Sequence, residues 1–178
     1  MSLKHPYLAD ASLVAGTMFV GAFEPPRRDL RHHIDAIALC ALERQPSNLA
    51  YTGIKVLHCP LMDDLASLTP DEFDMVHKTV RRVRTFLDEG RVVLVSCTMG
   101  LNRSGFIAAA TLMTPPNLAN RLMTVGSTPG CLTSSQAINL VRQARGPLAL
   151  SNPKFTYILA ASEHPCSYSR ANRASETF

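Results

Sequence analysis

The sequence predicts a single α/β domain of 178 residues, in which a central, mostly parallel, twisted sheet is flanked by helices. Three observations predict this fold. Short apolar runs typical of buried strands alternate with longer segments whose apolar residues recur at helical spacing. Hydrophobic residues make up 46% of the chain, which suits a packed core and argues against disorder. The order of the strand and helix segments along the chain indicates an α/β domain, so most of the strands are expected to run parallel.

The expected strands all lie before Cys97. Residues 12–22 indicate two short strands with a turn at Gly16-Thr17, and the later strands are expected over 34–42, 53–60 and 92–95.

The expected helices begin at Thr69, where an N-cap threonine precedes a proline and two acids. This first helix ends near Gly90. Further helices are expected over 105–113, 134–145 and 152–161, with an irregular connection over 114–133. The domain core is expected over about 12–161, with flexible tails at 1–10 and 165–178.

Charge and composition narrow the partners. The formal net charge is +4, there is no tryptophan, and the basic residues form no dense stripe, so we do not expect a nucleic-acid partner. A mild positive charge suits a phosphorylated substrate. Four basic residues of the first helix are interpreted as its solvated face: Lys78, Arg81, Arg82 and Arg84.

Membrane and metal sites are not expected. No run of about 18 apolar residues is present and residues 1–10 do not resemble a secretory signal, so we expect a cytoplasmic location and no membrane span. The six histidines lack ligand spacing, so neither a metal nor another cofactor is expected. The scattered cysteines fit a reducing compartment: Cys40, Cys59, Cys97, Cys131 and Cys166.

The most informative segment runs from Val92 to Ser104 and reads V-V-L-V-S-C-T-M-G-L-N-R-S. An apolar strand leads into Cys97, and Arg103 follows at the start of a helix of small apolar residues. Backbone N–H groups between a strand and a helix N-terminus can form an anion nest, and Gly100 permits the sharp turn. The same field favours a thiolate at Cys97, and Arg103 can bind two oxygens of one anion. The segment predicts a loop that holds a phosphate and attacks it.

Residues 97–104 resemble the phosphate-binding loop of the cysteine-dependent protein tyrosine phosphatases, and the short chain is most similar to the dual-specificity branch. The resemblance covers roughly residues 13–159. Pro60-Leu61-Met62-Asp63-Asp64 is similar to the segment that carries the family's general acid. N-L-V-R-Q-A-R at 139–145 and Asn152-Pro153-Lys154-Phe155 are similar to its last helices.

The resemblance implies a tyrosine-phosphatase-like fold and a phosphatase that acts on phosphotyrosine and phosphoserine or phosphothreonine. The sequence does not indicate an oligomeric state. Cys97 is expected to attack phosphorus, and Ser104 to ease departure of the thiolate. A loop aspartate is expected to protonate the leaving group and then activate water. Alignment on Pro60 favours Asp63 for this role, and Asp64 remains open. The expected phosphate-binding residues are Thr98, Met99, Gly100, Leu101, Asn102 and Arg103.

One position departs from the family pattern. Ser96 stands where the family usually has histidine, so the usual hydrogen bonds that tune the thiolate are not expected here.

Both aspartates are expected to follow a strand that neighbours the Cys97 strand. Cys40 is expected near the end of another neighbouring strand, where some relatives carry a cysteine that traps the oxidised nucleophile, and Cys59 is the next candidate.

The sequence leaves two other activities open. Thr98, Asn102 and Gly105-Phe106 also resemble the loop of capping-type RNA 5′-triphosphatases, but the resemblance implies that this branch lacks the aspartic acid. A lipid phosphatase is the second alternative. A non-catalytic phosphate-binding module would be favoured only if Cys97 were missing.

Overall fold

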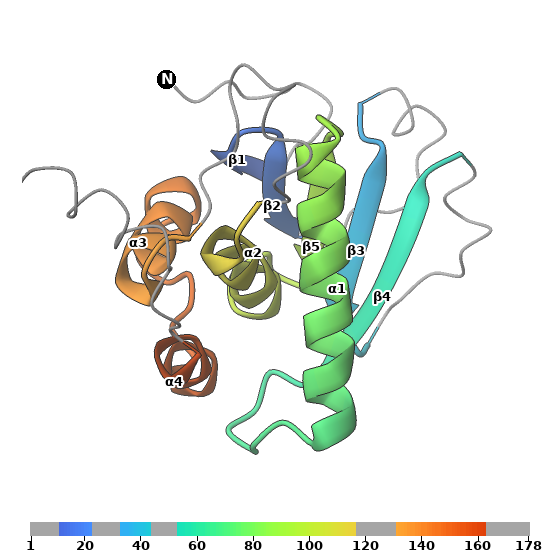
Figure 1. Ribbon diagram of the computed structural model, residues 1–178. Coiled ribbons are helices and arrows are strands. Elements are labelled where there is room, and N and C mark those ends of the chain that lie inside the picture. The colour runs from blue at the N-terminus through green and yellow to red at the C-terminus, as the bar shows by residue number, and fades with distance from the viewer. Residues whose placement is uncertain (1–10, 23–32, 44–52, 117–130, 163–178) are drawn as a thin grey trace, which may run out of the picture.

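The computed structural model describes residues 11–22, 33–43, 53–116 and 131–162, which contain five strands and four helices (Figure 1). The strands are β1 (Ala11–Ala15), β2 (Met18–Ala22), β3 (Ala36–Ala41), β4 (Lys55–Leu61) and β5 (Val93–Cys97). The helices are α1 (Pro70–Asp88), α2 (Arg103–Met113), α3 (Ser134–Arg145) and α4 (Pro153–Ala161). The expected α/β fold is confirmed.

The sheet has the strand order β1-β2-β5-β3-β4, and every neighbouring pair except β1–β2 is parallel. β5 lies in the middle, where Val95 pairs with Val20 on one side and with Ala38 on the other. All five residues of β5 are buried, as its continuous apolar run predicts. Because parallel strands end at the same edge of a sheet, Cys97 at the end of β5 lies beside the ends of β2 and β3.

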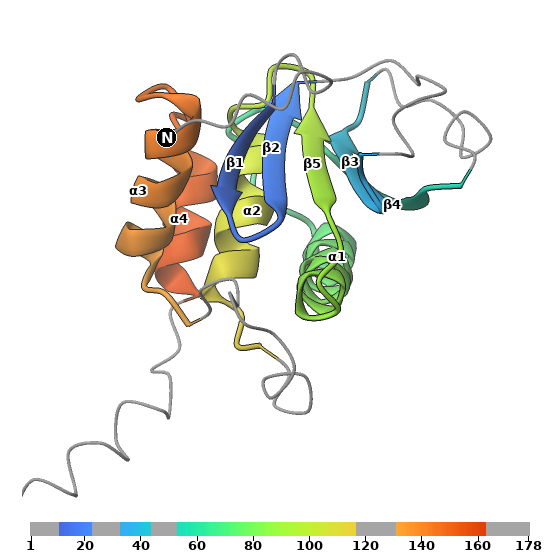
Figure 2. The same cartoon turned by 90° about the horizontal axis from the view of Figure 1, so that it is seen from above.

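Helices α1 and α2 cover one face of the sheet, and α3 and α4 pack against α2 (Figure 2). The small apolar residues of α2 suit a helix that is buried on most sides. Its Phe106 stacks on Phe155 of α4, with the ring centroids 4.9 Å apart. This packing fixes the N-termini of α2 and α4 relative to the end of β5.

The predicted start of α1 is confirmed. The Thr69 hydroxyl accepts a hydrogen bond from the Glu72 N–H at 3.2 Å, and the Glu72 carboxylate accepts one from the Thr69 N–H at 2.7 Å. This reciprocal capping box satisfies two backbone donors at the helix end. By contrast, α2 begins at Arg103 rather than at the expected residue 105. The expectation started two residues late because it followed the apolar pattern, to which the buried polar residues Arg103 and Ser104 do not belong.

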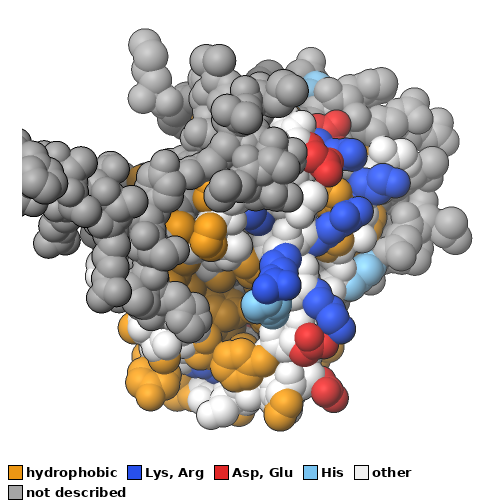
Figure 3. All heavy atoms as spheres, in the orientation of Figure 1, with side chains coloured by type: hydrophobic (Ala, Val, Ile, Leu, Met, Phe, Trp, Pro, Cys, Tyr) orange, Lys and Arg blue, Asp and Glu red, His pale blue; other side chains and the backbone are white. Residues whose placement is uncertain are grey.

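Basic side chains lie along α1 on the face seen in Figure 3. Lys78, Arg81 and Arg82 are exposed, as expected of a solvated face. The expectation was wrong for Arg84, whose side chain is 4% exposed and forms an ion pair with Asp88. An acid one turn further along the helix allows a guanidinium to be buried with a partner.

Several expectations concern residues outside the described ranges, among them most of the 114–133 connection and both tails. None of the helices in the described ranges is long and apolar enough to cross a membrane. Cys40, Cys59 and Cys97 are free thiols, whereas Cys131 is disulfide-bonded. Cysteine usage alone therefore does not argue for a reducing compartment.

Candidate active site

Residues 97–103, which join β5 to α2, are called the anion loop. Within it, Gly100 adopts a φ of +66°, a conformation that residues with a side chain rarely adopt. A Cβ atom at Gly100 would lie 2.4 Å from the carbonyl carbon of Gly21 and 2.5 Å from the backbone nitrogen of Ala22. Glycine is therefore required both for the turn and for the close approach of the end of β2.

Three carbonyl groups of the anion loop are held from outside the loop. Arg145, at the end of α3, donates from Nε to the carbonyl of Gly100 at 3.0 Å and from Nη2 to that of Met99 at 3.3 Å. The carbonyl of Leu101 accepts a hydrogen bond from the Leu150 N–H at 3.3 Å. Carbonyl oxygens that are held in this way cannot turn toward a bound anion and repel it, which suits an anion nest.

Cys97 is buried, with 3% of its surface exposed. Its Sγ lies 3.1 Å from the Oγ of Ser104 in the first turn of α2, so a hydroxyl is in hydrogen-bonding reach of the sulfur. The N-terminus of α2 adds partial positive charge nearby. Ser96, in place of the family's usual histidine, donates its hydroxyl to the carbonyl of Ala22 at 2.9 Å. This hydrogen bond joins β5 to β2.

The guanidinium of Arg103 is buried and is held by Glu43, which follows β3. Nη1 and Nη2 donate to the two carboxylate oxygens of Glu43 at 2.7 and 2.6 Å. Nη1 also donates to the carbonyl of Leu61 at 3.2 Å, and Nη2 to the hydroxyl of Thr98 at 3.0 Å. The Thr98 hydroxyl in turn donates to Glu43. The hydrogen bonds from Arg103, and then from Thr98, lower the pKa of Glu43 to about 2.

One donor of Arg103 remains unpaired. Its Nε is buried and has no hydrogen-bond partner in the described part of the chain, although the η nitrogens have four acceptor contacts. A buried N–H of a charged group costs free energy when it lacks an acceptor. Nε is therefore a donor suited to an oxygen atom that a ligand supplies.

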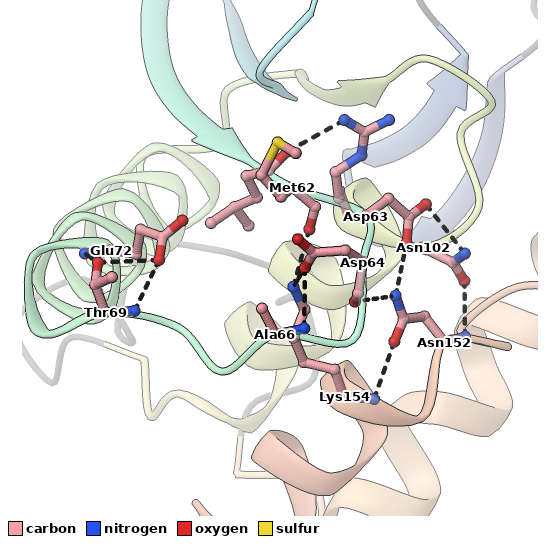
Figure 4. Close-up of polar contacts among 11 residues, drawn as sticks. Met62, Asp63, Asp64, Ala66, Thr69, Glu72, Asn102, Asn152 and Lys154 are labelled. Carbon is pink, nitrogen blue, oxygen red and sulfur yellow. Dashed lines mark hydrogen bonds and ion pairs between the residues drawn. The ribbon is translucent and has the colours of Figure 1, made fainter.

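Asp63 contacts the anion loop through its carboxylate (Figure 4). Oδ2 accepts a hydrogen bond from Nδ2 of Asn102 at 3.2 Å, and Oδ1 accepts one from Nδ2 of Asn152 at 2.8 Å. The expectation that the strand before Asp63 neighbours β5 was wrong, because β3 lies between β4 and β5. Strand order cannot be read from chain order. Although β3 separates the two strands, Asp63 contacts Asn102 of the anion loop directly and also contacts Asn152, which itself contacts Asn102.

Asp64 has different partners. Its Oδ1 accepts hydrogen bonds from Nζ of Lys154 at 2.7 Å and from the N–H of Ala66 at 3.2 Å. The hydrogen bond from Lys154 lowers the pKa of Asp64. Figure 4 shows Asp64 tied to Lys154, while Asp63 is joined to Asn102. The two neighbouring carboxylates, which sequence alignment left open, are thus in different environments.

The arrangement brings together a thiol with an adjacent hydroxyl, an open charged donor and a carboxyl group. Such a set can hold an oxyanion, attack its central atom and exchange a proton with a leaving group.

Burial raises the pKa of Cys59 to about 11 and that of Cys40 well above its ordinary value. Within the described ranges, no group of three or more His, Cys, Asp or Glu residues could hold a metal ion.

Sequence reasoning missed four residues of this site: Glu43, Arg145, Asn152 and Lys154. The last three lie in the two stretches that resemble the family's last helices. Their polar side chains beside apolar helix positions were the available signal. Glu43 gave no signal, because a single acid after a strand is common at protein surfaces.

Residues 26–124, more than half of the chain, match the sequence model of the dual specificity phosphatase catalytic domain. Three solved phosphatases share the fold. Tk-PTP in its active form has a TM-score of 0.65 and 22% sequence identity over 86% of this chain and 96% of that chain. Human DUSP28 also has a TM-score of 0.65 and 22% identity, over 86% and 92%. PTPMT1 in complex with PI(5)P has a TM-score of 0.63 and 17% identity, over 91% and 97%. Comparison with curated proteins finds no match.

Proposed function

The chain belongs to the dual specificity phosphatase family, and from that premise we propose that it hydrolyses phosphotyrosine and phosphoserine or phosphothreonine through a cysteinyl-phosphate intermediate on Cys97. The family match makes the chain a cysteine-dependent phosphatase. The residue roles are inferred from the site, and the choice among phosphorylated substrates is inferred from the family match.

The unpaired Nε of Arg103 is the observation that carries this proposal. Glu43 occupies the end of the guanidinium, which leaves the edge formed by Nε and Nη2 for phosphate oxygens. When phosphate binds, Nη2 exchanges its contact with Thr98 for a phosphate oxygen, and Arg103 then binds two oxygens from one edge. Backbone N–H groups of the anion loop bind the remaining oxygens.

The reaction proceeds in two steps. The thiolate of Cys97 forms a bond to phosphorus while the ester oxygen leaves and takes a proton from Asp63. The Asp63 carboxylate then accepts a proton from water, whose oxygen attacks phosphorus and releases the thiolate. The Ser104 hydroxyl, 3.1 Å from the sulfur, donates a hydrogen bond to the departing thiolate.

Asp63 is a better general acid than Asp64 on two grounds. The Asp63 carboxylate contacts Asn102, inside the anion loop, whereas Asp64 contacts Lys154 of α4. Lys154 also lowers the pKa of Asp64, which opposes the protonated form that an acid needs. The proton donor should therefore be Asp63.

The other activities are less well supported. The family match favours neither the capping-type RNA triphosphatase nor the lipid phosphatase, although PTPMT1 is solved with a phosphoinositide. We propose a cytoplasmic location because that is usual for the family. No nucleic-acid partner is proposed.

A substrate panel tests the proposal. The panel contains p-nitrophenyl phosphate, a phosphotyrosine peptide, a phosphoserine peptide, a phosphoinositide and a 5′-triphosphate RNA, assayed with the wild type, Asp63→Asn and Asp64→Asn. Both peptides should be hydrolysed, and Asp63→Asn should lower kcat on phosphoserine by about 10²- to 10⁴-fold. Asp64→Asn should have a much smaller effect. Exclusive turnover of the lipid or the RNA would overturn the substrate class, and equal effects of the two variants would overturn the acid assignment.

A further inference from the structure

The segment after β4, residues 62–64, is called the acid segment. It has no regular structure, yet two side chains at the start of α4 bind all three of its residues (Figure 4). Nζ of Lys154 donates to the carbonyl of Met62 at 3.0 Å and to Oδ1 of Asp64 at 2.7 Å. Nδ2 of Asn152 donates to Oδ1 of Asp63 at 2.8 Å and to the carbonyl of Asp64 at 2.9 Å.

Both donors are anchored in the core. The side chain of Lys154 is 5% exposed, and its ammonium lies 5.0 Å from the centroid of the Phe155 ring. Phe155 is fully buried and stacks on Phe106 of α2. Asn152 is buried and caps α4 by accepting a hydrogen bond from the Lys154 N–H at 3.0 Å. A buried ammonium is costly without a partner, so this arrangement favours the conformation in which the acid segment is bound.

Asn102 links this helix end to the anion loop. Its Oδ1 accepts hydrogen bonds from the Asn152 N–H at 3.2 Å and from the Ser151 hydroxyl at 3.3 Å. Its Nδ2 donates to Asp63 at 3.2 Å. The start of α4, the acid segment and the anion loop therefore form one hydrogen-bonded network, which is complete without a substrate.

We propose that Asn152 and Lys154 are positioning residues, which hold the Asp63 carboxyl group at the anion loop before a substrate binds. The inference rests on the proposed role of Asp63 as the general acid. Neither residue needs to touch the phosphate. A displacement of about 1 Å of a catalytic group can cost about 10²-fold in rate, so release of the acid segment should slow proton transfer specifically.

Two variants remove these contacts with little change elsewhere. Lys154→Met keeps an unbranched side chain beside Phe155 but removes the ammonium. Asn152→Ser keeps a hydroxyl that can cap α4, since serine caps helices as well as asparagine does, but removes the amide donor to Asp63. Lys154→Arg is the conservative control. Thr133→Ala, which removes the cap of α3 far along the chain from the acid segment, is the control for lost stability alone.

The readout is the dependence of kcat on the leaving group. A phosphoserine peptide needs a proton for its leaving oxygen, and p-nitrophenyl phosphate needs little. On phosphoserine, Lys154→Met and Asn152→Ser should each lower kcat by about 10- to 100-fold, while on the aryl ester the loss should stay within about twofold. Lys154→Arg should retain most of the wild-type kcat on phosphoserine. Thr133→Ala should leave kcat unchanged on both substrates.

Combining the variants with Asp63→Asn separates this inference from the proposed function. If Asn152 and Lys154 act through Asp63, adding either substitution to Asp63→Asn should lower kcat no further. Losses that are equal for both substrates, or that persist in the Asp63→Asn background, would overturn the positioning role. An Asp63→Asn variant with normal kcat on phosphoserine would instead overturn the acid assignment on which the inference rests.

Discussion

Glu43 binds both η nitrogens of Arg103, at 2.7 and 2.6 Å, so the arginine of the anion loop is oriented by a carboxylate at the end of β3. A guanidinium presents two adjacent edges, and occupation of one leaves the other for a second anion. In the proposed mechanism, Glu43 thus fixes the direction from which Arg103 binds phosphate. The pair also offsets the cost of burying the guanidinium.

Replacing Glu43 with glutamine tests this relationship. The neutral amide removes the ionic contact, and kcat/KM should fall by about tenfold on both peptide and aryl substrates, a modest loss because Glu43 is partly exposed. The loss should be constant from about pH 5 to about pH 8. The pKa of Glu43 is lowered to about 2, so its contribution is fully present above the ordinary glutamate pKa and disappears only as the pH falls toward 2.

A rise in kcat/KM instead of a fall would contradict this role of Glu43. If Glu43→Gln raised kcat/KM, Glu43 would compete with phosphate for Arg103 instead of orienting it. Glu43→Asp, which keeps the charge on a shorter side chain, is the control for geometry.

A comparison of two glycines tests the shape of the anion loop. Gly100 and Gly90 both have positive φ, at +66° and +74°, but only a Cβ at Gly100 would clash with neighbouring atoms. Gly90→Ala should cost about 1–2 kcal/mol of stability and leave kcat/KM unchanged. Gly100→Ala should in addition abolish most of the activity, because the end of β2 and the loop cannot both keep their places. Equal activity of the two variants would contradict the account of the loop.

Asn152→Asp should change the pH dependence of turnover. Aspartate still caps α4, but it replaces an amide donor with a second carboxylate beside Asp63. A like charge opposes ionisation, so the limb of the kcat profile that reports the acid should move to higher pH for a phosphoserine peptide. Asn152→Ser, which removes the same amide donor but adds no charge, should shift the limb in the same direction by a smaller amount. An unchanged pH profile of kcat for Asn152→Asp would show that this limb does not report the ionisation of Asp63.

We expect Cys40, rather than Cys59, to be the thiol that protects an oxidised Cys97. Leu39 of β3 pairs with Ser96 of β5, and Cys40 and Cys97 are the next residues on these two adjacent parallel strands. The spacing between neighbouring strands therefore places their Cα atoms about 5 Å apart, which is within the range that a disulfide can span. Cys59 lies on β4, two strand spacings or about 10 Å from β5. After mild peroxide, the sulfenic acid of Cys97 would condense with the Cys40 thiol, forming a disulfide and releasing water.

Recovery with dithiothreitol measures this protection. Activity should return in the wild type and in Cys59→Ser, whereas Cys40→Ser should recover less because its sulfenic acid proceeds to sulfinic acid. If Cys40→Ser recovered as fully as the wild type, Cys40 would not be the resolving thiol.

The elements could be predicted from the sequence where local signals are strong. The capping pattern at Thr69 sets the start of α1, and the apolar run before Cys97 sets β5, because both depend on neighbouring residues alone. The short spacing from Cys97 to Arg103 likewise determines the anion loop. Such features need no knowledge of distant contacts.

Long-range relationships could not be predicted in this way. The position of β4 at the sheet edge, and the contacts of Glu43 and Asn152, join segments that lie far apart along the chain. Asp63 and Asp64 are adjacent in sequence, and what distinguishes them is that the Asp63 carboxylate contacts Asn102 of the anion loop, whereas the Asp64 carboxylate contacts Lys154 of α4. A resemblance can point to such a segment without showing which of its side chains meets the site.

The most direct test of the account is detection of the phosphorylated cysteine. Asp63→Asn should react with p-nitrophenyl phosphate faster than its intermediate is hydrolysed, because the aryl leaving group needs little protonation but water still lacks a base. Rapid denaturation followed by peptide mass spectrometry should find one phosphoryl group on the peptide that contains Cys97, with a matching burst of p-nitrophenol, and neither signal in Cys97→Ser. Turnover without phosphate on Cys97, or phosphate on a different residue, would contradict the central claim.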